Sequence, residues 1–290
     1  MVVARFDSSS AAATVPFTLP RIADPTRRED GMLLEGKVAI VSGVGPGLGH
    51  ATALALAREG ASVVLAARNE SYLKEVAAEI EERGGRPLPV ATDVTDPEQC
   101  GHLADTAASE LGGLDVLVNN AFRYDPTQPF EEVDLAEWRQ VYEVNVFGSL
   151  QLTKATIPHL KSRGGGSVVF VNSMSARKIR FNEGGYASSK GALLTAVQVL
   201  AKELGAHQIR VNSVVPGWIW GPPVQGYVAW QAQQRGVSPD EVVAEIVAEI
   251  PLGAIPPQDD VANAIVFFAS DLARWVTGQA LDVNGGEWFH

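Results

Sequence analysis

Lys37-Val-Ala-Ile-Val-Ser42 runs directly into Gly43-Val-Gly-Pro-Gly47-Leu-Gly49, and the helical pattern of residues 50–58 follows at once. The first segment is a β-branched run typical of a buried strand. A strand, a glycine turn and a helix N-terminus together present free backbone N–H groups, which can hold a pyrophosphate. A glycine-rich turn can also be a tight turn and nothing more. Its position at the first strand–helix junction favours the phosphate site.

Strand-like and helix-like segments alternate along the chain from Lys37 onward. Strands are expected at 37–42, 62–67, 87–91, 114–118, 167–172, 209–214 and 279–283, and amphipathic helices at 47–59, 71–83, 97–111, 134–162, 185–205 and 258–270. Alternation of this kind predicts a parallel sheet that is covered on both faces. We therefore expect an α/β fold: a single Rossmann-like, doubly wound domain with a seven-stranded, mostly parallel sheet flanked by helices.

The amino-terminal residues differ in composition from the rest of the chain. Residues 1–31 contain a run of small and polar residues at 8–14, three prolines and the charged segment 27–30. They lack the apolar core of a secretory signal, and no run in the chain is long enough to span a bilayer. We expect residues 1–33 to form a flexible arm and residues 34–290 to form the catalytic domain.

Composition and charge narrow the classes of partner and site. The chain has 290 residues, of which 46% are hydrophobic, and this is enough to bury a large core. A net charge of −11 argues against a nucleic acid or an anionic membrane as partner. Cys100 is the only cysteine, so no internal disulfide can form, which fits a reducing cytoplasm. The five histidines do not cluster, so no metal site is expected.

Tyr186 and Lys190 are four residues apart in Tyr186-Ala-Ser-Ser-Lys190, which places them on one face of a helix. A free phenol titrates near ~10, so it needs positive charge beside it to act as an acid or base at neutral pH. An ammonium about 5 Å away contributes roughly 3 kcal/mol, or about two pKa units. The spacing therefore predicts that Lys190 lowers the pKa of Tyr186.

Ser173 lies thirteen residues before Tyr186, at the end of the β-branched segment 167–172. Such a run predicts a buried parallel strand that delivers Ser173 at its carboxyl end. Ligands of open α/β sheets bind at that edge. Ser173 is therefore expected at the ligand-binding edge of the sheet.

These segments resemble the short-chain dehydrogenase/reductase family, in its branch with a Tyr-x3-Lys pair and a Gly-x3-Gly-x-Gly cofactor turn, from about residue 34 to residue 287. The resemblance implies strand order 3-2-1-4-5-6-7. It implies a catalytic tetrad of Asn145, Ser173, Tyr186 and Lys190. The cofactor contacts that it implies are Gly43, Gly47, Leu48, Gly49, Arg68, Asp93, Val94, Asn120, Ala121, Tyr186, Lys190, Pro216, Gly217 and Ile219.

The sequence departs from the family pattern at two positions near the expected cofactor. Phe122 follows Asn119-Asn120-Ala121 where the family has glycine. Gly221 stands four residues after Gly217, where the family usually has a threonine that holds the nicotinamide carboxamide. The resemblance therefore implies that the side-chain contact to the carboxamide is missing or different in this chain.

The end of the second expected strand bears on the choice of cofactor. An acidic residue there binds the ribose hydroxyls of NAD, whereas an arginine can pair with the 2′-phosphate of NADP. Ala67 fills the acidic position and Arg68 comes next. NADP(H) is therefore favoured and NAD(H) remains possible. The alternative is that Arg68 is only a solvated residue at a helix start.

The segment 218–251 is expected to be a flap over the substrate, as the resemblance implies. Trp218, Trp220 and Trp230 predict an apolar substrate wall, although they could instead pack against a neighbouring subunit or the core. Three basic residues precede Tyr186, and they either meet an acidic group or form a solvated face: Arg177, Lys178 and Arg180.

The expected activity is that of an NAD(P)(H)-dependent oxidoreductase that interconverts a ketone or aldehyde and an alcohol on a small apolar molecule. The family's reductases of conjugated C=C bonds place the lysine seven residues after the tyrosine, and the spacing here is four. A non-catalytic dinucleotide-binding regulator or scaffold is the alternative, but such proteins usually lose a catalytic residue. Members of the family usually form dimers or tetramers, so the resemblance implies a cytoplasmic dimer or tetramer built on helices 134–162 and 185–205.

Overall fold

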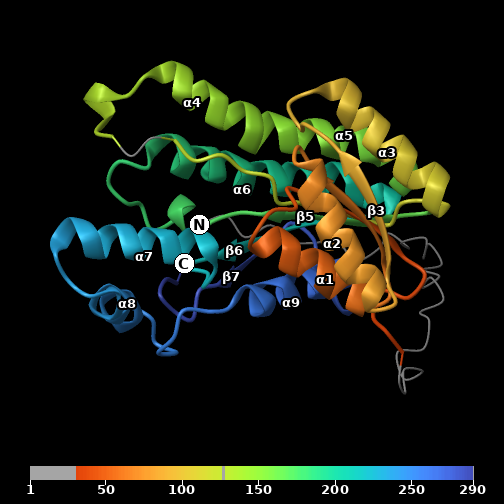
Figure 1. The fold of residues 1–290 in the computed structure, drawn as a ribbon. Helices are drawn as coiled ribbons and strands as arrows, with labels where there is room; N and C mark the ends of the chain where they lie inside the picture. The colour runs from red at the N-terminus through yellow and green to blue at the C-terminus, as the bar shows by residue number, and fades with distance from the viewer. Residues whose placement is uncertain (1–30, 126–127, 290) are drawn as a thin grey trace, which may run out of the picture. The chain divides into compact units, whose positions relative to one another are not determined.

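A parallel sheet of seven strands forms the centre of the computed structural model, which describes residues 31–125 and 128–289 (Figure 1). The strand order is β3-β2-β1-β4-β5-β6-β7, and every pairing between neighbours is parallel. The predicted order and fold class are thus confirmed. The strands are β1 Val38–Ser42, β2 Ser62–Ala67, β3 Arg86–Ala91, β4 Val116–Asn119, β5 Gly166–Val171, β6 Ile209–Pro216 and β7 Ala280–Val283.

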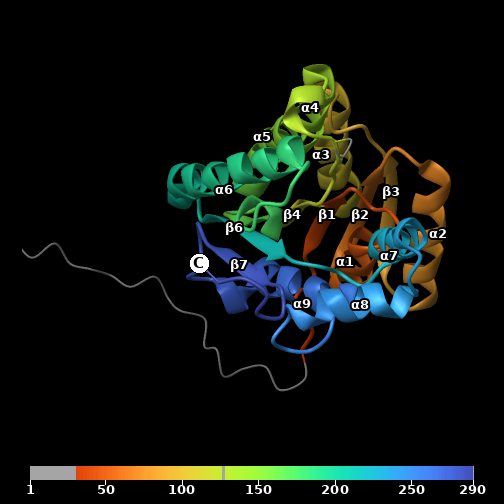
Figure 2. The same ribbon diagram turned by 90° about the vertical axis from the view of Figure 1, so that its left-hand side faces the viewer.

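Helices cover both faces of this sheet (Figures 1 and 2). One hydrophobic cluster joins α1, α2 and α9 to the sheet, and a second joins α3, α5 and α6 to its opposite face. The helices are α1 Leu48–Arg58, α2 Glu70–Glu82, α3 Pro97–Leu111, α4 Leu135–Tyr142, α5 Ser149–Ser162, α6 Gly184–Leu204, α7 Pro222–Arg235, α8 Pro239–Ala248 and α9 Gln258–Ala269. Short 3₁₀ turns lie at Phe130–Glu132, Met174–Ala176, Gly205–His207 and Asp271–Ala273.

The expected helix 134–162 is divided by a π-helical turn at Glu143–Gly148, between α4 and α5. The backbone does not break, because the residues that flank the turn keep right-handed helical angles. Such single-turn π segments are frequent at functional sites. This one carries Asn145, which the resemblance placed in the catalytic tetrad.

The helix α7 was not predicted, because its sequence begins with two prolines, has a glycine at 226 and shows little apolar periodicity. Pro222 and Pro223 begin it, since a proline at the first helical position loses no hydrogen bond. Helix α8 begins after Ser238, whose side chain forms a reciprocal capping box with Glu241. The flap segment is therefore mostly two helices.

The glycine turn is shaped by close contacts that leave no room for a side chain at Gly43 or Gly49. A Cβ on Gly49 would lie 2.3 Å from the Gly43 carbonyl oxygen, and one on Gly43 would lie 2.5 Å from the Ala121 backbone. Gly43 also has a φ of +79°, which disfavours any residue with a side chain. Asn120 donates its amide N–H to the Gly43 carbonyl at 2.8 Å, and this fixes the turn against the end of β4.

We predict that Gly49→Ala destabilises the fold, because the added methyl group must displace backbone of the same turn. Overpacking of this kind costs about 1–3 kcal/mol. Gly45→Ala is the matched control in the same turn, since a Cβ there meets nothing within 4 Å. Urea denaturation measures both variants. Equal free energies of unfolding for the two variants would contradict this account of the turn.

Candidate active site

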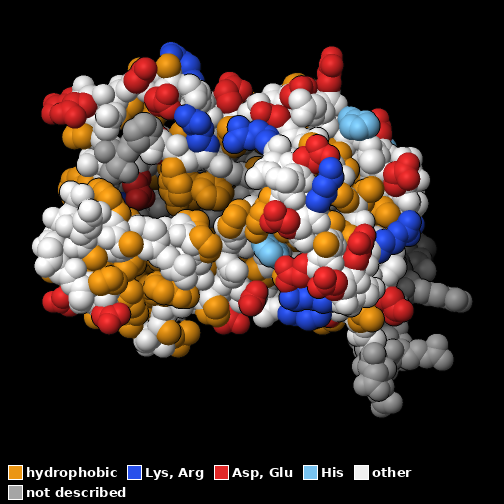
Figure 3. All heavy atoms as spheres, viewed as in Figure 1, with side chains coloured by type: hydrophobic (Ala, Val, Ile, Leu, Met, Phe, Trp, Pro, Cys, Tyr) orange, Lys and Arg blue, Asp and Glu red, His pale blue; other side chains and the backbone are white. Residues whose placement is uncertain are grey.

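Four strand ends and residues of the helices α1, α6, α7 and α9 surround one cavity of about 980 Å³. The glycine turn after β1, Asn120 after β4, Ser173 after β5 and Gly217 after β6 all line it. Figure 3 shows hydrophobic side chains gathered in a recess on this face of the molecule. Parallel strands bring their carboxyl ends to one edge, so residues far apart in sequence meet there.

The structure places most of the predicted site residues in this cavity. Its lining includes the predicted Gly43, Gly47, Leu48, Gly49, Asn120, Ser173, Tyr186, Lys190, Pro216, Gly217 and Ile219. Five predicted residues are not part of the lining: Arg68, Asp93, Val94, Ala121 and Asn145. Arg68 is exposed directly after β2, and Val94 is buried against Gly148.

Tyr186 is the centre of the polar cluster in the cavity. It lies in the first turn of α6, is 5% exposed and makes side-chain hydrogen bonds with Ser173 and Tyr124. The rings of Tyr186 and Tyr124 lie 4.1 Å apart between centroids. Ser173 is also fixed by the Ser175 backbone N–H, which donates to its hydroxyl at 3.1 Å. The predicted Ser173–Tyr186 pair is therefore assembled in the structure.

Lys190 is buried one turn after Tyr186, and its Nζ lies 5.6 Å from the centroid of the tyrosine ring. Its ammonium donates to the Val171 carbonyl oxygen at 2.8 Å. Burial lowers the pKa of Lys190 from its ordinary value to about 7. A proton on this amine is thus readily lost near neutral pH.

The pKa of Tyr186 does not follow the sequence prediction. Burial raises it well above its ordinary value, the charge of Tyr124 raises it further, and the hydrogen bond from Ser173 opposes them. We had expected Lys190 to lower the pKa of this phenol. In the structure the pKa of Tyr186 is raised instead. Burial disfavours the phenolate form of Tyr186, and it also disfavours the protonated form of Lys190 beside it.

The side chain of Asn145 hydrogen-bonds the loop after β4 and does not line the cavity. Its side chain accepts from the Arg123 backbone N–H at 2.7 Å and donates to the Arg123 carbonyl at 3.1 Å. It also donates to the Ser189 hydroxyl in α6 at 2.9 Å. Asn145 therefore ties the segment that carries Tyr124 to the helix that carries Tyr186.

Asp125 is a functional position that the sequence analysis missed. Its carboxylate accepts the backbone N–H groups of Gly185 and Tyr186 at 2.9 and 3.0 Å, and the Trp138 indole N–H at 3.1 Å. A carboxylate at a helix N-terminus satisfies free donors and complements the helix dipole. Asp125 thereby fixes the turn that presents Tyr186. The only signal was Phe122, which departs from the family pattern just before this loop.

The opposite wall of the cavity is aromatic and carries one basic side chain. Trp218, Tyr227 and Trp230 line it, with neighbouring rings 5.2 and 6.2 Å apart. The Arg180 guanidinium lies over the Trp218 ring at 4.1 Å and 3.6 Å from a Glu287 carboxylate oxygen. Lys178 holds that same oxygen more closely, at 3.0 Å. Arg180 therefore belongs to the cavity wall.

Neither a metal site nor a membrane-spanning segment is found in the described part of the chain. Within residues 31–125 and 128–289, no group of three or more His, Cys, Asp or Glu side chains is arranged to hold a metal ion. None of the helices described is both long and apolar enough to cross a bilayer. The expected flexible arm lies outside the described residues, apart from its last three.

Comparison with known proteins establishes the family. A family model described as enoyl-(acyl carrier protein) reductase matches residues 43–287. The 7α-hydroxysteroid dehydrogenase of Escherichia coli (strain K12) is 35% identical over 257 residues, which cover 89% of this chain and 96% of the relative. The cis-4-hydroxycyclohexanecarboxylate dehydrogenase of Sinomonas cyclohexanicum is 37% identical over 250 residues, or 86% and 96%.

A solved structure agrees with these relatives. A 7α-hydroxysteroid dehydrogenase complexed with NADH and 7-oxo glycochenodeoxycholic acid superimposes with a TM-score of 0.80 at 36% identity, covering 89% of this chain and 97% of the other. The chain belongs to the short-chain dehydrogenase/reductase family. It is a dinucleotide-dependent oxidoreductase that interconverts CH–OH and C=O groups.

We predict that Lys190→Met changes how stability depends on pH. An unfolded lysine holds its proton up to about pH 10.4, whereas folded Lys190 releases it near a pKa of about 7. The unfolded chain therefore binds more protons across this window, and this residue makes wild-type stability rise with pH. The variant lacks that rise.

Urea denaturation at several pH values from about 7 to about 10 measures the difference. Lys202→Met, at an exposed position of the same helix, is the matched control and should keep the wild-type dependence. Parallel curves for wild type and Lys190→Met would contradict the burial of a titrating amine.

Proposed function

We propose that Tyr186 is the acid and base of a carbonyl–alcohol redox reaction in this cavity. The observation that carries the proposal is the buried Tyr186 hydroxyl, hydrogen-bonded to Ser173, in a cavity that the glycine turn also lines. In reduction, Tyr186 Oη donates its proton to the carbonyl oxygen of the substrate. In oxidation, Oη takes the proton of the substrate hydroxyl. Its raised pKa keeps the hydroxyl protonated at neutral pH, which is the form that reduction requires.

The residues around Tyr186 take supporting roles in this proposal. Ser173 hydrogen-bonds the reacting oxygen and stabilises the charge that develops on it. Lys190 holds or releases a proton near neutral pH beside the phenol. Asn145 positions the loop of Tyr124, which hydrogen-bonds Tyr186.

The cavity fits a nicotinamide dinucleotide. Gly45 and Gly47 line the cavity and their Cβ positions are free of close protein contacts, so ligand atoms can approach the backbone closely at the start of α1. The glycine turn would hold the pyrophosphate, and Tyr186 and Lys190 would hold the ribose of the nicotinamide, as the resemblance implies. The bound dinucleotide supplies the hydride or accepts it.

The substrate that we propose is a largely apolar alcohol or ketone that carries an acid group. Trp218, Tyr227 and Trp230 offer it an aromatic wall. Arg180 lies at this wall, and a carboxylate would form a charge-assisted hydrogen bond with its guanidinium. The named substrates of two relatives, a bile acid derivative and a hydroxycyclohexanecarboxylate, have this combination.

The flap proposed for residues 218–251 consists mainly of α7 and α8. The two helices share a small apolar cluster of their own, built on Val228, Ala232 and Val242. Arg235 and Glu245 join them by an ion pair at 2.6 Å. A unit with its own contacts can move as one body, and we propose that it closes over the bound substrate.

We predict that Tyr186→Phe lowers kcat by at least ~10²-fold, because the variant cannot transfer the proton. Turnover is followed by NAD(P)H absorbance. The substrates are acidic 7α-hydroxysteroids and cis-4-hydroxycyclohexanecarboxylate, and each acid is compared with its neutral methyl ester. Cofactor affinity should fall by no more than about 10-fold, which corresponds to one lost hydrogen bond to the ribose, and acids should be turned over better than esters.

Tyr72→Phe, on α2 and outside the cavity, is the control and should retain wild-type turnover. Wild-type kcat in Tyr186→Phe would overturn the assignment of the acid and base.

We propose that NADP is preferred over NAD. The Gly43 N–H donates to the Ala66 carbonyl at 2.8 Å, so the end of β2 lies beside the glycine turn. Ala67 brings no carboxylate to this position, and the exposed Arg68 follows it. A 2′-phosphate could therefore pair with Arg68 without repulsion from an acidic neighbour.

A charge-assisted contact of roughly 1.5–3 kcal/mol predicts a preference for NADP of about 10- to 150-fold in kcat/KM. Ala67→Asp combined with Arg68→Ile should reverse it, since a carboxylate repels the phosphate and binds the ribose hydroxyls. Equal use of the two cofactors by wild type, or better use of NAD, would refute the role of Arg68.

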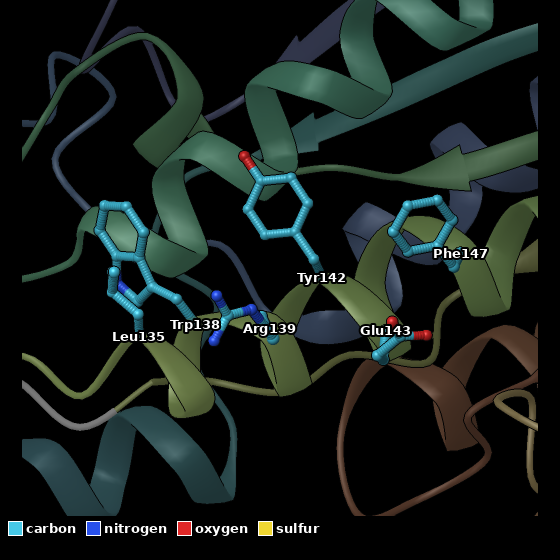
Figure 4. A pocket seen from close by; sticks show the side chains of 6 residues that line it. All are labelled: Leu135, Trp138, Arg139, Tyr142, Glu143 and Phe147. Atoms are coloured by element: carbon cyan, nitrogen blue, oxygen red, sulfur yellow. The ribbon is translucent and has the colours of Figure 1, made fainter.

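We propose a homodimer or homotetramer that uses the surface of α4 and the π-helical turn. A groove of about 300 Å³ lies there, lined by Leu135, Trp138, Arg139, Tyr142, Glu143 and Phe147 (Figure 4). Leu135 and Phe147 are half exposed, which is typical of an apolar surface that a partner covers. Light scattering measures the state, and a monomer would contradict the proposal.

We also propose that the enzyme works in the cytoplasm. Cys100 is buried and is a free thiol, which suits a reducing compartment. The net charge of −11 favours solubility over binding to anionic surfaces.

A further inference from the structure

Gln258 is the first residue of α9 and lies against the loop that follows β6. The Trp220 backbone N–H donates to the Pro256 carbonyl at 2.8 Å, and Trp220 and Pro257 form an isolated parallel bridge. These contacts fix the start of α9 beside Gly221. Gln258 lines the same cavity as the glycine turn and Lys190.

The side-chain oxygen of Gln258 is buried and lacks a hydrogen bond. Among residues 31–125 and 128–289, no atom donates to Gln258 Oε1. A buried acceptor without a donor is costly, and native structures keep few of them without a reason. Such an acceptor in a ligand cavity indicates a donor on the ligand.

Distances from the Cβ positions of two glycines show that this oxygen lies between the two ends of the cavity. A Cβ on Gly221 would lie 3.0 Å from Gln258 Oε1, and one on Gly47 would lie 3.8 Å from it. Gly47 belongs to the turn proposed for the pyrophosphate, and Gly221 follows the strand whose end faces the proposed nicotinamide. The oxygen therefore lies between the diphosphate turn and the reacting end of the site.

We propose that Gln258 Oε1 accepts a hydrogen bond from the carboxamide NH₂ of the nicotinamide, and this rests on the proposed dinucleotide function. A phosphate at neutral pH offers no donor to an amide oxygen beside it. The ribose hydroxyls and the carboxamide do offer donors, but Tyr186 and Lys190 are already proposed to hold the ribose of the nicotinamide, whereas no side chain has been proposed to hold the carboxamide.

Gly221 makes room for this arrangement. The family pattern places a threonine at position 221, and a side chain there would press on Gln258, since even its Cβ would lie at 3.0 Å. The glycine at 221 and the glutamine at 258 are therefore coupled. The glutamine reaches the space from another element, which explains how the chain can do without the threonine.

The test compares binding of NADPH, NADH and ADP-ribose to wild type and Gln258→Leu, by calorimetry and without substrate. Leucine keeps most of the side-chain volume and removes the acceptor. Loss of one hydrogen bond should weaken binding of both reduced dinucleotides by about 3- to 10-fold. ADP-ribose lacks the nicotinamide and should bind both proteins equally. Asp259→Asn, on the next residue of α9, is the control and should match wild type.

A second arm changes the ligand instead of relying on the variant alone. Wild type should bind NAD more tightly than its 3-acetylpyridine analogue, whose acetyl group has no N–H donor, and Gln258→Leu should lose that preference. Equal weakening of ADP-ribose and NADPH would place Gln258 at a part that both ligands share, such as a ribose hydroxyl, and overturn the proposal, as would unchanged binding of all ligands. If wild type bound none of these ligands, the proposed dinucleotide function itself would fail.

Discussion

The parallel register of four central strands is the constraint on which the site depends. Ser42 in β1 lies opposite Asn119 in β4, and Asn119 in turn lies opposite Phe170 in β5. Because these strands end in register, the loops that follow them begin at one edge of the sheet. The glycine turn, Asn120 and Ser173 meet there although they are up to 130 residues apart. No single segment could make this site alone.

A network of polar contacts fixes Tyr186 at that edge. Asn145 holds the loop after β4 by its backbone, and Asp125 of this loop holds the first turn of α6. Each of these contacts joins two different elements of the fold. Tyr186 therefore cannot shift without breaking several hydrogen bonds. The cost is burial of two titratable groups, which raises the pKa of Tyr186 and lowers that of Lys190 to about 7. Such shifts are common where proton transfer takes place.

Local pattern was sufficient to predict a parallel sheet covered on both faces, whereas its strand order and most of the cavity residues were implied by the family resemblance. The buried strands have β-branched runs, and glycine positions 43, 47 and 49 mark a turn that only short residues fit. What the sequence could not reveal depends on contacts between distant elements. Asp125 and Gln258 matter because of the helices and turns that tertiary packing brings to them. The direction of the Tyr186 pKa was predicted wrongly, because spacing reports the neighbouring charge and does not report desolvation.

The most direct test of the central claim follows the hydride itself. Reduction of a 7-oxo steroid or 4-oxocyclohexanecarboxylate would be run with NADPH that carries deuterium at the reacting face of C4, and the product would be examined by mass spectrometry. The account predicts one deuterium on the new carbinol carbon, with none when the label is on the opposite face. A reduced product that contains no deuterium from either labelled cofactor would contradict hydride transfer at this site.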